Sequence, residues 1–184
     1  MIIMTGFAGL AGTMTLLEKE KESLLKRFSR SFIDSVPAYD PSETAKITGS
    51  ILEGGEVQNI VEAGKDGIYA ALWELGEQMS CGMRIDAPAL SILQETIEIA
   101  DCLDINPYED DSTGCFLFTA EGEKADLIIR KLQEKGIAAG IIGYETKDRD
   151  RLLMKGTERR YLTPASRIES EKKQRETYNA KRDK

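Results

Sequence analysis

Apolar residues recur along the chain in two patterns, one typical of helices and one typical of strands. Spacings of three and four residues predict amphipathic helices, and capping residues, Pro and Gly indicate where they end. The helices expected on this basis are residues 13–28 with Thr13 as the cap, 32–36, 41–53, 68–80, 92–103 and 122–135. Short apolar or β-branched runs predict strands at 2–5, 57–63, 83–86, 115–119 and 137–143, and a terminal hairpin formed by 152–154 and 160–162.

The order of these elements indicates the fold class. Strands and helices follow one another in two mixed blocks, which predicts an α/β or α+β domain with helices packed on a mixed central sheet. The strand at 57–63 is expected to be buried, and the domain is expected to cover residues 1–165. From residue 166 the chain holds seven basic and four acidic residues, so 166–184 is expected to be a charged tail, either a frayed helix or disordered.

Composition narrows the possible functions. The chain has 184 residues, 41% of them hydrophobic and 31% charged, as in one globular domain that builds its own core. A net charge of −7 argues against nucleic acid as a partner. The three cysteines are far apart in the sequence, which indicates reduced thiols. The absence of histidine excludes catalytic triads and metal sites with histidine ligands. No apolar stretch approaches the ~20 residues of a membrane span, so we expect a cytoplasmic protein without membrane contact.

The sharpest local motif lies between the 57–63 strand and the following helix. A glycine loop at a helix N-terminus presents free N–H groups to a phosphate, and a lysine adds charge. The motif is not a P-loop, because Asn59 and Asp66 stand where glycine and Ser or Thr are required. A structural turn with Asp66 as a capping carboxylate is the alternative. The candidate phosphate-binding residues are Glu62, Gly64, Lys65, Asp66 and Gly67.

An acidic loop at 109–114 is the second candidate. Its carboxylates and hydroxyls could hold Mg²⁺ or meet a nucleotide, whereas a solvated acidic loop is the alternative. The candidate ligand-binding residues here are Ser112, Thr113 and Gly114. Cys115 follows on a strand and reads as a core residue, since no base is present to activate it.

A glycine-rich turn at 6–12 is the third candidate. Repeated glycines allow the backbone to approach a ligand or another chain closely, although a tight turn from strand to helix explains them equally well. The candidate interface residues are Gly6, Phe7, Gly9 and Gly12. Trp73, with Tyr69 four residues earlier, is expected in the core or at an interface.

Six segments, in order, carry a resemblance to a known family. They are 5–13 (TGFAGLAGT), 24–29 (LLKRFS), 67–74 (GIYAALWE), 94–99 (QETIEI), 104–108 (DINPY) and 158–162 (ERRYL). Together they resemble the C-terminal half of the aminoimidazole ribonucleotide (AIR) synthetase-related proteins, in particular those similar to the hydrogenase maturation factor HypE. The resemblance covers residues 1–163 and implies a mixed sheet with packed helices, partly like a ferredoxin-like split βαβ arrangement.

The resemblance also implies that a separate domain binds the nucleotide. Complete members of this superfamily place an ATP-binding domain ahead of this one, and that domain supplies the aspartates for Mg²⁺ and most nucleotide contacts. The family motif Asp-Val-Thr-Glu-Gly-Gly-Ile aligns with 62–68, where Gly67 matches but the aspartate, the threonine and one glycine are replaced, and Ser-Ser-Gly-Ser aligns with 112–115. The terminal cysteine that accepts the carbamoyl group in HypE is also missing here. The expected cofactors are therefore none, or ATP with Mg²⁺ held through a partner domain.

These observations favour a stand-alone C-terminal domain that acts as a binding or assembly module, with no catalytic residue and no metal of its own. The expected partner is a second copy or a separate ATP-binding-domain protein, docked near the 6–12 turn and the Gly64 loop. One alternative is an enzyme subunit in which Glu62, Lys65 and the backbone of Asp66 and Gly67 complete a phosphate site. The other is a sensor of a phosphorylated metabolite.

Overall fold

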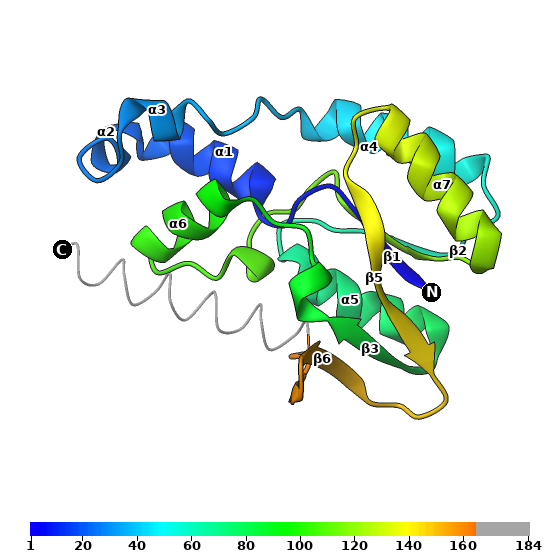
Figure 1. Ribbon diagram of the computed structural model, residues 1–184. Coiled ribbons are helices and arrows are strands. Elements are labelled where there is room, and N and C mark those ends of the chain that lie inside the picture. Colours follow the sequence, from blue (N-terminus) through cyan, green and yellow to red (C-terminus); the bar gives the residue numbers. More distant parts are fainter. Residues whose placement is uncertain (165–184) are drawn as a thin grey trace.

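A seven-stranded mixed sheet forms the centre of the structure (Figure 1). The computed structural model describes residues 1–164, so the tail expected at 166–184 lies outside the described residues. The strands, in the order β2-β4-β1-β5-β3-β6-β7, pair antiparallel except for the parallel pair β3 and β6. They are β1 (Ile2–Thr5), β2 (Gln58–Glu62), β3 (Gly82–Asp86), β4 (Phe116–Thr119), β5 (Ala139–Thr146), β6 (Arg151–Lys155) and β7 (Glu158–Tyr161).

Seven α-helices and two short 3₁₀ helices accompany the sheet within residues 1–164. The α-helices are α1 (Leu10–Lys19), α2 (Lys21–Leu24), α3 (Arg30–Ile33), α4 (Pro41–Glu53), α5 (Gly67–Met79), α6 (Gln94–Cys102) and α7 (Gly122–Glu134); the 3₁₀ helices are η1 (Ala87–Ala89) and η2 (Pro107–Glu109). The mixed α/β fold is therefore confirmed, as are the helices expected at 41–53, 68–80 and 122–135. None of the helices in the described residues is long and apolar enough to cross a membrane.

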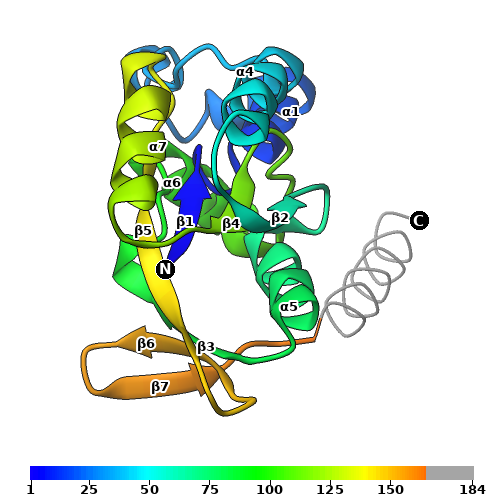
Figure 2. The ribbon, with the colours of Figure 1, turned by 90° about the vertical axis from the view of Figure 1, so that its right-hand side faces the viewer.

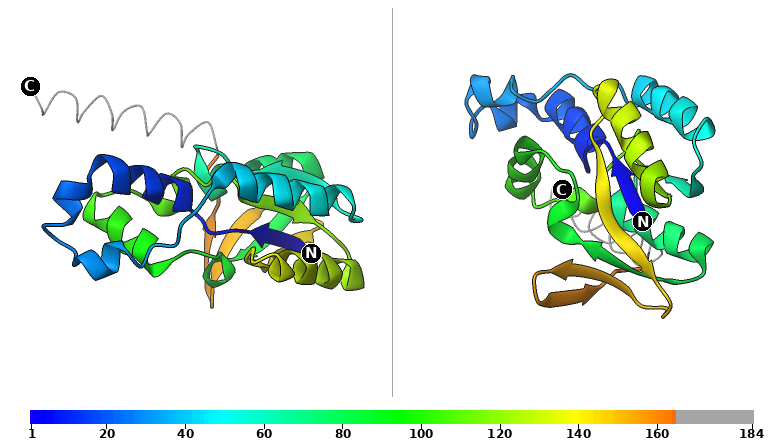
Figure 3. Two further views of the ribbon diagram at one scale, coloured as in Figure 1. Left: turned by 90° about the horizontal axis from the view of Figure 1, so that it is seen from above. Right: turned by 45° about the vertical axis from the view of Figure 1, so that its right-hand side comes forward.

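The two faces of the sheet carry separate cores. On one face α5 packs Ile68, Leu72 and Leu75 onto the sheet. On the other face α4 and α7 pack over Ile3 and Phe118. Figure 2 shows α5 and α7 on opposite sides of β1, so the sheet is the middle layer of three. A third cluster joins α1, α2, α3 and α6 at one end of the molecule, as Figure 1 and the left view of Figure 3 show.

Three sequence predictions about these elements are wrong. Thr13 does not cap the first helix: α1 begins at Leu10 with Gly9 as N-cap, in the left-handed region (φ 67°), and the Thr13 hydroxyl donates to the Gly9 carbonyl inside the helix at 2.9 Å. The helix also ends at Lys19, since the backbone of Glu20 (φ −110°, ψ 17°) leaves helical geometry. The strand expected to be buried, β2, lies at the sheet edge, and Val61 is its only buried residue.

Candidate functional site

The structure brings the three segments of candidate residues together at one end of the sheet. β1 and β2 end where β4 begins, because both pair antiparallel with β4. The segments that extend these strand ends are the 6–12 turn, the 64–67 loop and the 110–114 loop, which we call the three-loop end. The Ser112 N–H donates to the Gly64 carbonyl at 3.1 Å, and the Gly9 N–H donates to the Ser112 hydroxyl at 2.9 Å.

Buried Ser112 is the link between the three loops. Its hydroxyl accepts from the Gly9 N–H and donates to the Asp110 carbonyl at 2.9 Å. A second link joins the Gly12 N–H to the Asp111 carbonyl at 2.9 Å. Two residues expected at a ligand site or interface, Ser112 and Gly9, thus use their polar groups inside the chain, where they hold the loops together.

Two glycines of the three-loop end permit a close approach between backbones of this chain. A Cβ on Gly67, which has φ +76°, would lie 2.5 Å from the Tyr108 carbonyl oxygen. A Cβ on Gly9 would lie 2.7 Å from the Pro107 carbonyl oxygen. The close approach expected at the 6–12 turn is therefore found, at Gly9, between loops of the same molecule, and Gly67 makes another.

Only part of the phosphate candidate is open to solvent. Glu62, Gly64, Lys65 and Asp66 are exposed, whereas Gly67 is buried and its N–H donates to the Gly64 carbonyl at 3.1 Å. The acidic segment 109–111 lies beside this loop, because Gly67 contacts it. Carboxylates therefore outnumber the single lysine, which disfavours an anion. Within residues 1–164, no group of three or more carboxylates and thiols is arranged to hold a metal ion.

Thr113 and Gly114 lie against Tyr39, a residue that the sequence patterns did not single out. The Tyr39 hydroxyl donates to the Thr113 carbonyl at 2.8 Å. Gly114, at φ +89°, leaves room for that hydroxyl, and burial raises the pKa of Tyr39. Because Tyr39 lies in a loop far from 113 in sequence, no spacing rule connects the two.

Beside Tyr39 lies a pocket of about 370 Å³. It is bounded by the start of α1, by α4 and by the chain that leads into β5, and Gly6 and Phe7 from the interface candidates line it. Its lining residues are Gly6, Phe7, Leu10, Pro37, Ala38, Tyr39, Asp40, Glu43, Thr44, Ile47, Lys135, Gly136, Ile137 and Ala138. Part of the 6–12 turn, at Gly6, Phe7 and Leu10, is therefore accessible to a ligand or partner through this pocket.

Comparison with protein families identifies the domain. Residues 1–155 match the family described as AIR synthase related protein, C-terminal domain. The chain belongs to this family. Among curated proteins nothing matches it.

Solved structures share the fold at low sequence identity. Hydrogenase maturation protein HypE from E. coli superposes with a TM-score of 0.71 and 18% identity, over 88% of this chain and 49% of that one. The structure of a HypE–HypF complex superposes with a TM-score of 0.67 and 14% identity, over 89% of this chain and 52% of that one. PurL from T. maritima, complexed with FGAR, superposes with a TM-score of 0.58 and 15% identity, over 91% of this chain and 27% of that one. This AIR synthase related domain thus spans about half of each HypE chain and about a quarter of PurL.

Cys115 has the environment of a core residue. Its thiol is fully buried, its Sγ donates to the Phe7 carbonyl at 3.2 Å, and burial raises its pKa to about 12. Since the thiolate is the nucleophilic form, such a thiol is unreactive at neutral pH.

The raised pKa of Cys115 predicts a loss of stability in alkali. Between its ordinary pKa of 9.0 and about 12, the unfolded chain loses a proton that the folded chain keeps. The free energy of unfolding should then fall by up to about 1.4 kcal/mol per pH unit, and the contribution should be complete below pH 9. Urea unfolding at several pH values above 9 would measure this slope. Cys115→Ala should flatten it and Cys102→Ala should not; equal slopes in all three proteins would contradict the assignment.

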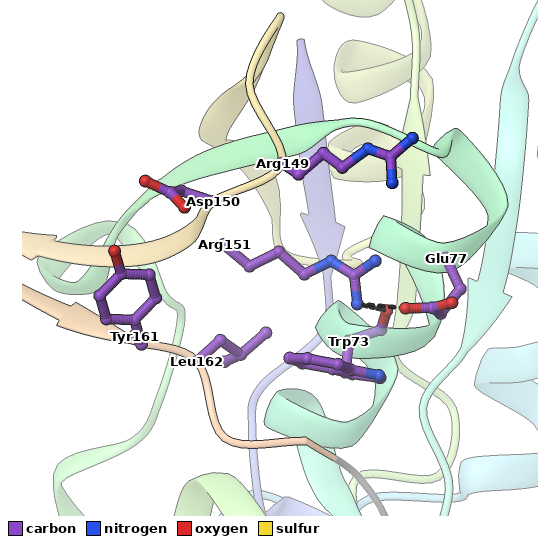
Figure 4. Close-up of a pocket in the computed structure, with 7 residues that line it drawn as sticks. All are labelled: Trp73, Glu77, Arg149, Asp150, Arg151, Tyr161 and Leu162. Atoms are coloured by element: carbon purple, nitrogen blue, oxygen red, sulfur yellow. Dashed lines mark hydrogen bonds and ion pairs between the residues drawn. The ribbon is translucent and has the colours of Figure 1, made fainter.

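A second pocket, of about 260 Å³, lies between α5 and the β6–β7 hairpin (Figure 4). Arg151 Nη1 lies 2.5 Å from Glu77 Oε1, and its guanidinium carbon lies 4.3 Å from the Trp73 ring centroid. Trp73, half-buried, packs against the core on one side and faces this pocket on the other. The sequence singled out Trp73 but not Arg151, because the contact joins residues 78 positions apart.

Proposed function

We propose that this AIR synthase related domain is a binding or assembly module that carries out no ATP chemistry by itself. The observation that supports the proposal most directly is the internal use of the polar groups at the three-loop end. The Ser112 hydroxyl and the N–H groups of Gly9, Gly12 and Gly67 are hydrogen-bonded within the chain, so they hold loops in place. An anion site needs such N–H groups to point at the ligand.

The proposed docking surface is the accessible part of the three-loop end. Glu62, Lys65 and Asp66 supply charges of both signs, and Phe7 lies in the adjoining pocket. Mixed charge around an aromatic group is typical of protein interfaces. A HypE of the same fold is found in a complex with HypF, so proteins with this fold do assemble with others. The proposed partner is a second copy or a separate ATP-binding-domain protein.

A second candidate is a subunit that completes a phosphate site with a partner domain, or a sensor that uses the same loop for a phosphorylated metabolite. It is favoured by the exposure of Gly64 and Lys65 beside the N-terminus of the 13-residue helix α5.

Thermal unfolding separates these candidates. With MgATP, MgADP, phosphate or a panel of ribonucleotides, we expect the midpoint of the free chain to move by less than about 1 °C. A ligand present at 100 times its dissociation constant would add about 2.7 kcal/mol, and each kcal/mol moves the midpoint by about 2–4 °C. A shift of several degrees that Lys65→Ala abolishes, and the control Lys46→Ala on α4 retains, would overturn the module in favour of the second candidate.

Sedimentation equilibrium tests the partner directly. Under the proposal, either the chain self-associates or it binds an added ATP-binding domain of the HypE class, and the charge reversal Lys65→Glu weakens the association. A chain that sediments as a monomer, both alone and with the added domain, would count against docking at the three-loop end.

A further inference from the structure

The last strand of the sheet has an open edge. β7 is the outer strand at the opposite edge from β2, and among the described strands it pairs only with β6. All four of its residues are exposed, and Tyr161 is 67% exposed. Figure 2 shows the β6–β7 hairpin at the far end of the sheet from α4 and α7. The outer N–H and C=O groups of such a strand are available to pair with another chain.

Positive charge collects around this edge although the chain as a whole is acidic. Residues 149–164 contain five Lys and Arg but only two Asp and Glu. In the described part of the chain, Arg149, Lys155 and Arg159 have no carboxylate within ion-pair distance, unlike Arg84 and Arg151. The cations of the hairpin are therefore poorly compensated inside the molecule, which favours an acidic partner.

A shallow pocket adjoins the same strand. It has a volume of about 290 Å³, and Ala87, Leu153 and Met154 are the apolar part of its lining. Three cations, Lys155, Arg159 and Arg160, and one carboxylate, Glu158, complete the lining. The pocket thus offers apolar contact next to positive charge.

A second copy of this chain fits the edge poorly in most registers. In a two-fold antiparallel pairing of β7 with itself, two of the three central registers place arginines opposite each other without a compensating pair: Arg159 against Arg160, and Arg160 against Arg160. The third, Arg159 against Arg159, also places Glu158 opposite Arg160 and is the one register that suits a second copy. Like charges directly opposite each other destabilise an antiparallel pair. The same arginines would attract a strand that carries carboxylates.

We propose that the β7 edge binds an extended acidic segment of a partner protein, which adds one strand to the sheet. Side chains alternate between the two faces, so Arg159 and Tyr161 lie on one face and Arg160 on the other. Arg160 is held against α5, where its Nη2 lies 3.3 Å from the Tyr69 hydroxyl. An acidic residue of the segment that lies opposite Arg159 would therefore meet an uncompensated cation, while backbone hydrogen bonds supply binding that does not depend on sequence. Lys155 pairs with Glu158 and so lies on the other face, with Arg160.

A defined peptide tests this proposal. The probe is a six-residue peptide of alternating glutamate and threonine with blocked ends, titrated into the full chain by calorimetry, with hydrogen exchange of β7 followed in parallel. We expect binding and slower exchange in β7. Arg159→Glu should weaken binding by about tenfold or more. Lys131→Glu on the exposed face of α7 is the control and should leave binding unchanged. If the charge-reversal variant does not fold, the milder variant Arg159→Gln replaces it, with its folding checked by circular dichroism, and it should also weaken binding.

Three further ligands are tested in the same way, and for each of them one result would overturn the proposal. A peptide methylated at alternate backbone nitrogens keeps its charges but cannot pair, so equal binding would exclude strand addition. A lysine–threonine peptide that binds as well as the acidic one would exclude charge recognition. A ten-residue oligothymidylate that binds at β7 while the acidic peptide does not would assign the edge to single-stranded nucleic acid. Because Lys65 plays no part here, failure of this proposal is distinguishable from failure of the docking surface at the three-loop end.

Discussion

Replacement of Gly67 by alanine is expected to lower the free energy of unfolding by about 3 kcal/mol or more. Two costs combine at this position. Gly67 has φ +76°, a conformation that L side chains rarely adopt, and its Cβ would lie 2.5 to 2.8 Å from backbone atoms of residues 108–110. Backbone atoms in a packed loop cannot move aside as the end of a flexible side chain can. The expected result is a shift of the urea midpoint and disturbance of the three-loop end.

Gly136 provides a matched control for this prediction. It has the same φ of +76°, but nothing lies within 4 Å of its Cβ position. Gly136→Ala should therefore cost only the conformational strain, about 1 kcal/mol. The difference between the two variants measures how tightly the 64–67 loop packs on residues 108–110. Equal effects would mean that this close approach contributes nothing to stability.

Replacement of Phe118 by alanine is expected to cost about 3–5 kcal/mol. Phe118 is fully buried on β4, in the core under α4 and α7. Removing its ring leaves a cavity that the surrounding side chains fill only in part. For a domain of this size, each kcal/mol corresponds to about 2–4 °C in the midpoint of thermal unfolding. Thermal and urea unfolding would both report the loss.

Tyr144→Ala is the control for Phe118→Ala. Tyr144 is also an aromatic residue on a strand, β5, but 59% of it is exposed. Its removal should cost about 1 kcal/mol or less, the range of strand propensity on an open face. A loss at Phe118 as small as that at Tyr144 would show that the α4–α7 face contributes little to folding.

Elements with strong local signals were predicted well from the sequence. The helix expected at 41–53 begins after a capping residue and at a proline: the Asp40 side chain accepts from the N–H groups of Ser42 and Glu43 at the start of α4. The strands at 115–119 and 137–143 and the terminal hairpin were also found, each within a few residues of the expected bounds. These signals are local because caps, proline and apolar spacing act within one turn or one strand.

The errors arose where distant residues decide the outcome. Helix α1 begins at Leu10 because Gly9 is held by Ser112, a residue 103 positions away. The 57–63 strand was expected to be buried, yet β2 lies at the edge because β4 is its only partner among the described strands. No pattern within a single segment contains that information.

The sequence by itself determined the fold class, most of the elements and the resemblance to the AIR synthase related family, because apolar periodicity and short motifs are local properties. Only the tertiary structure decided that the 6–12, 64–67 and 110–114 segments meet, and that their polar groups are hydrogen-bonded to one another. It also decided which strand edges stay open. Strand order and loop contacts depend on pairing between residues that are far apart in the sequence. No local pattern specifies which of these distant residues pair.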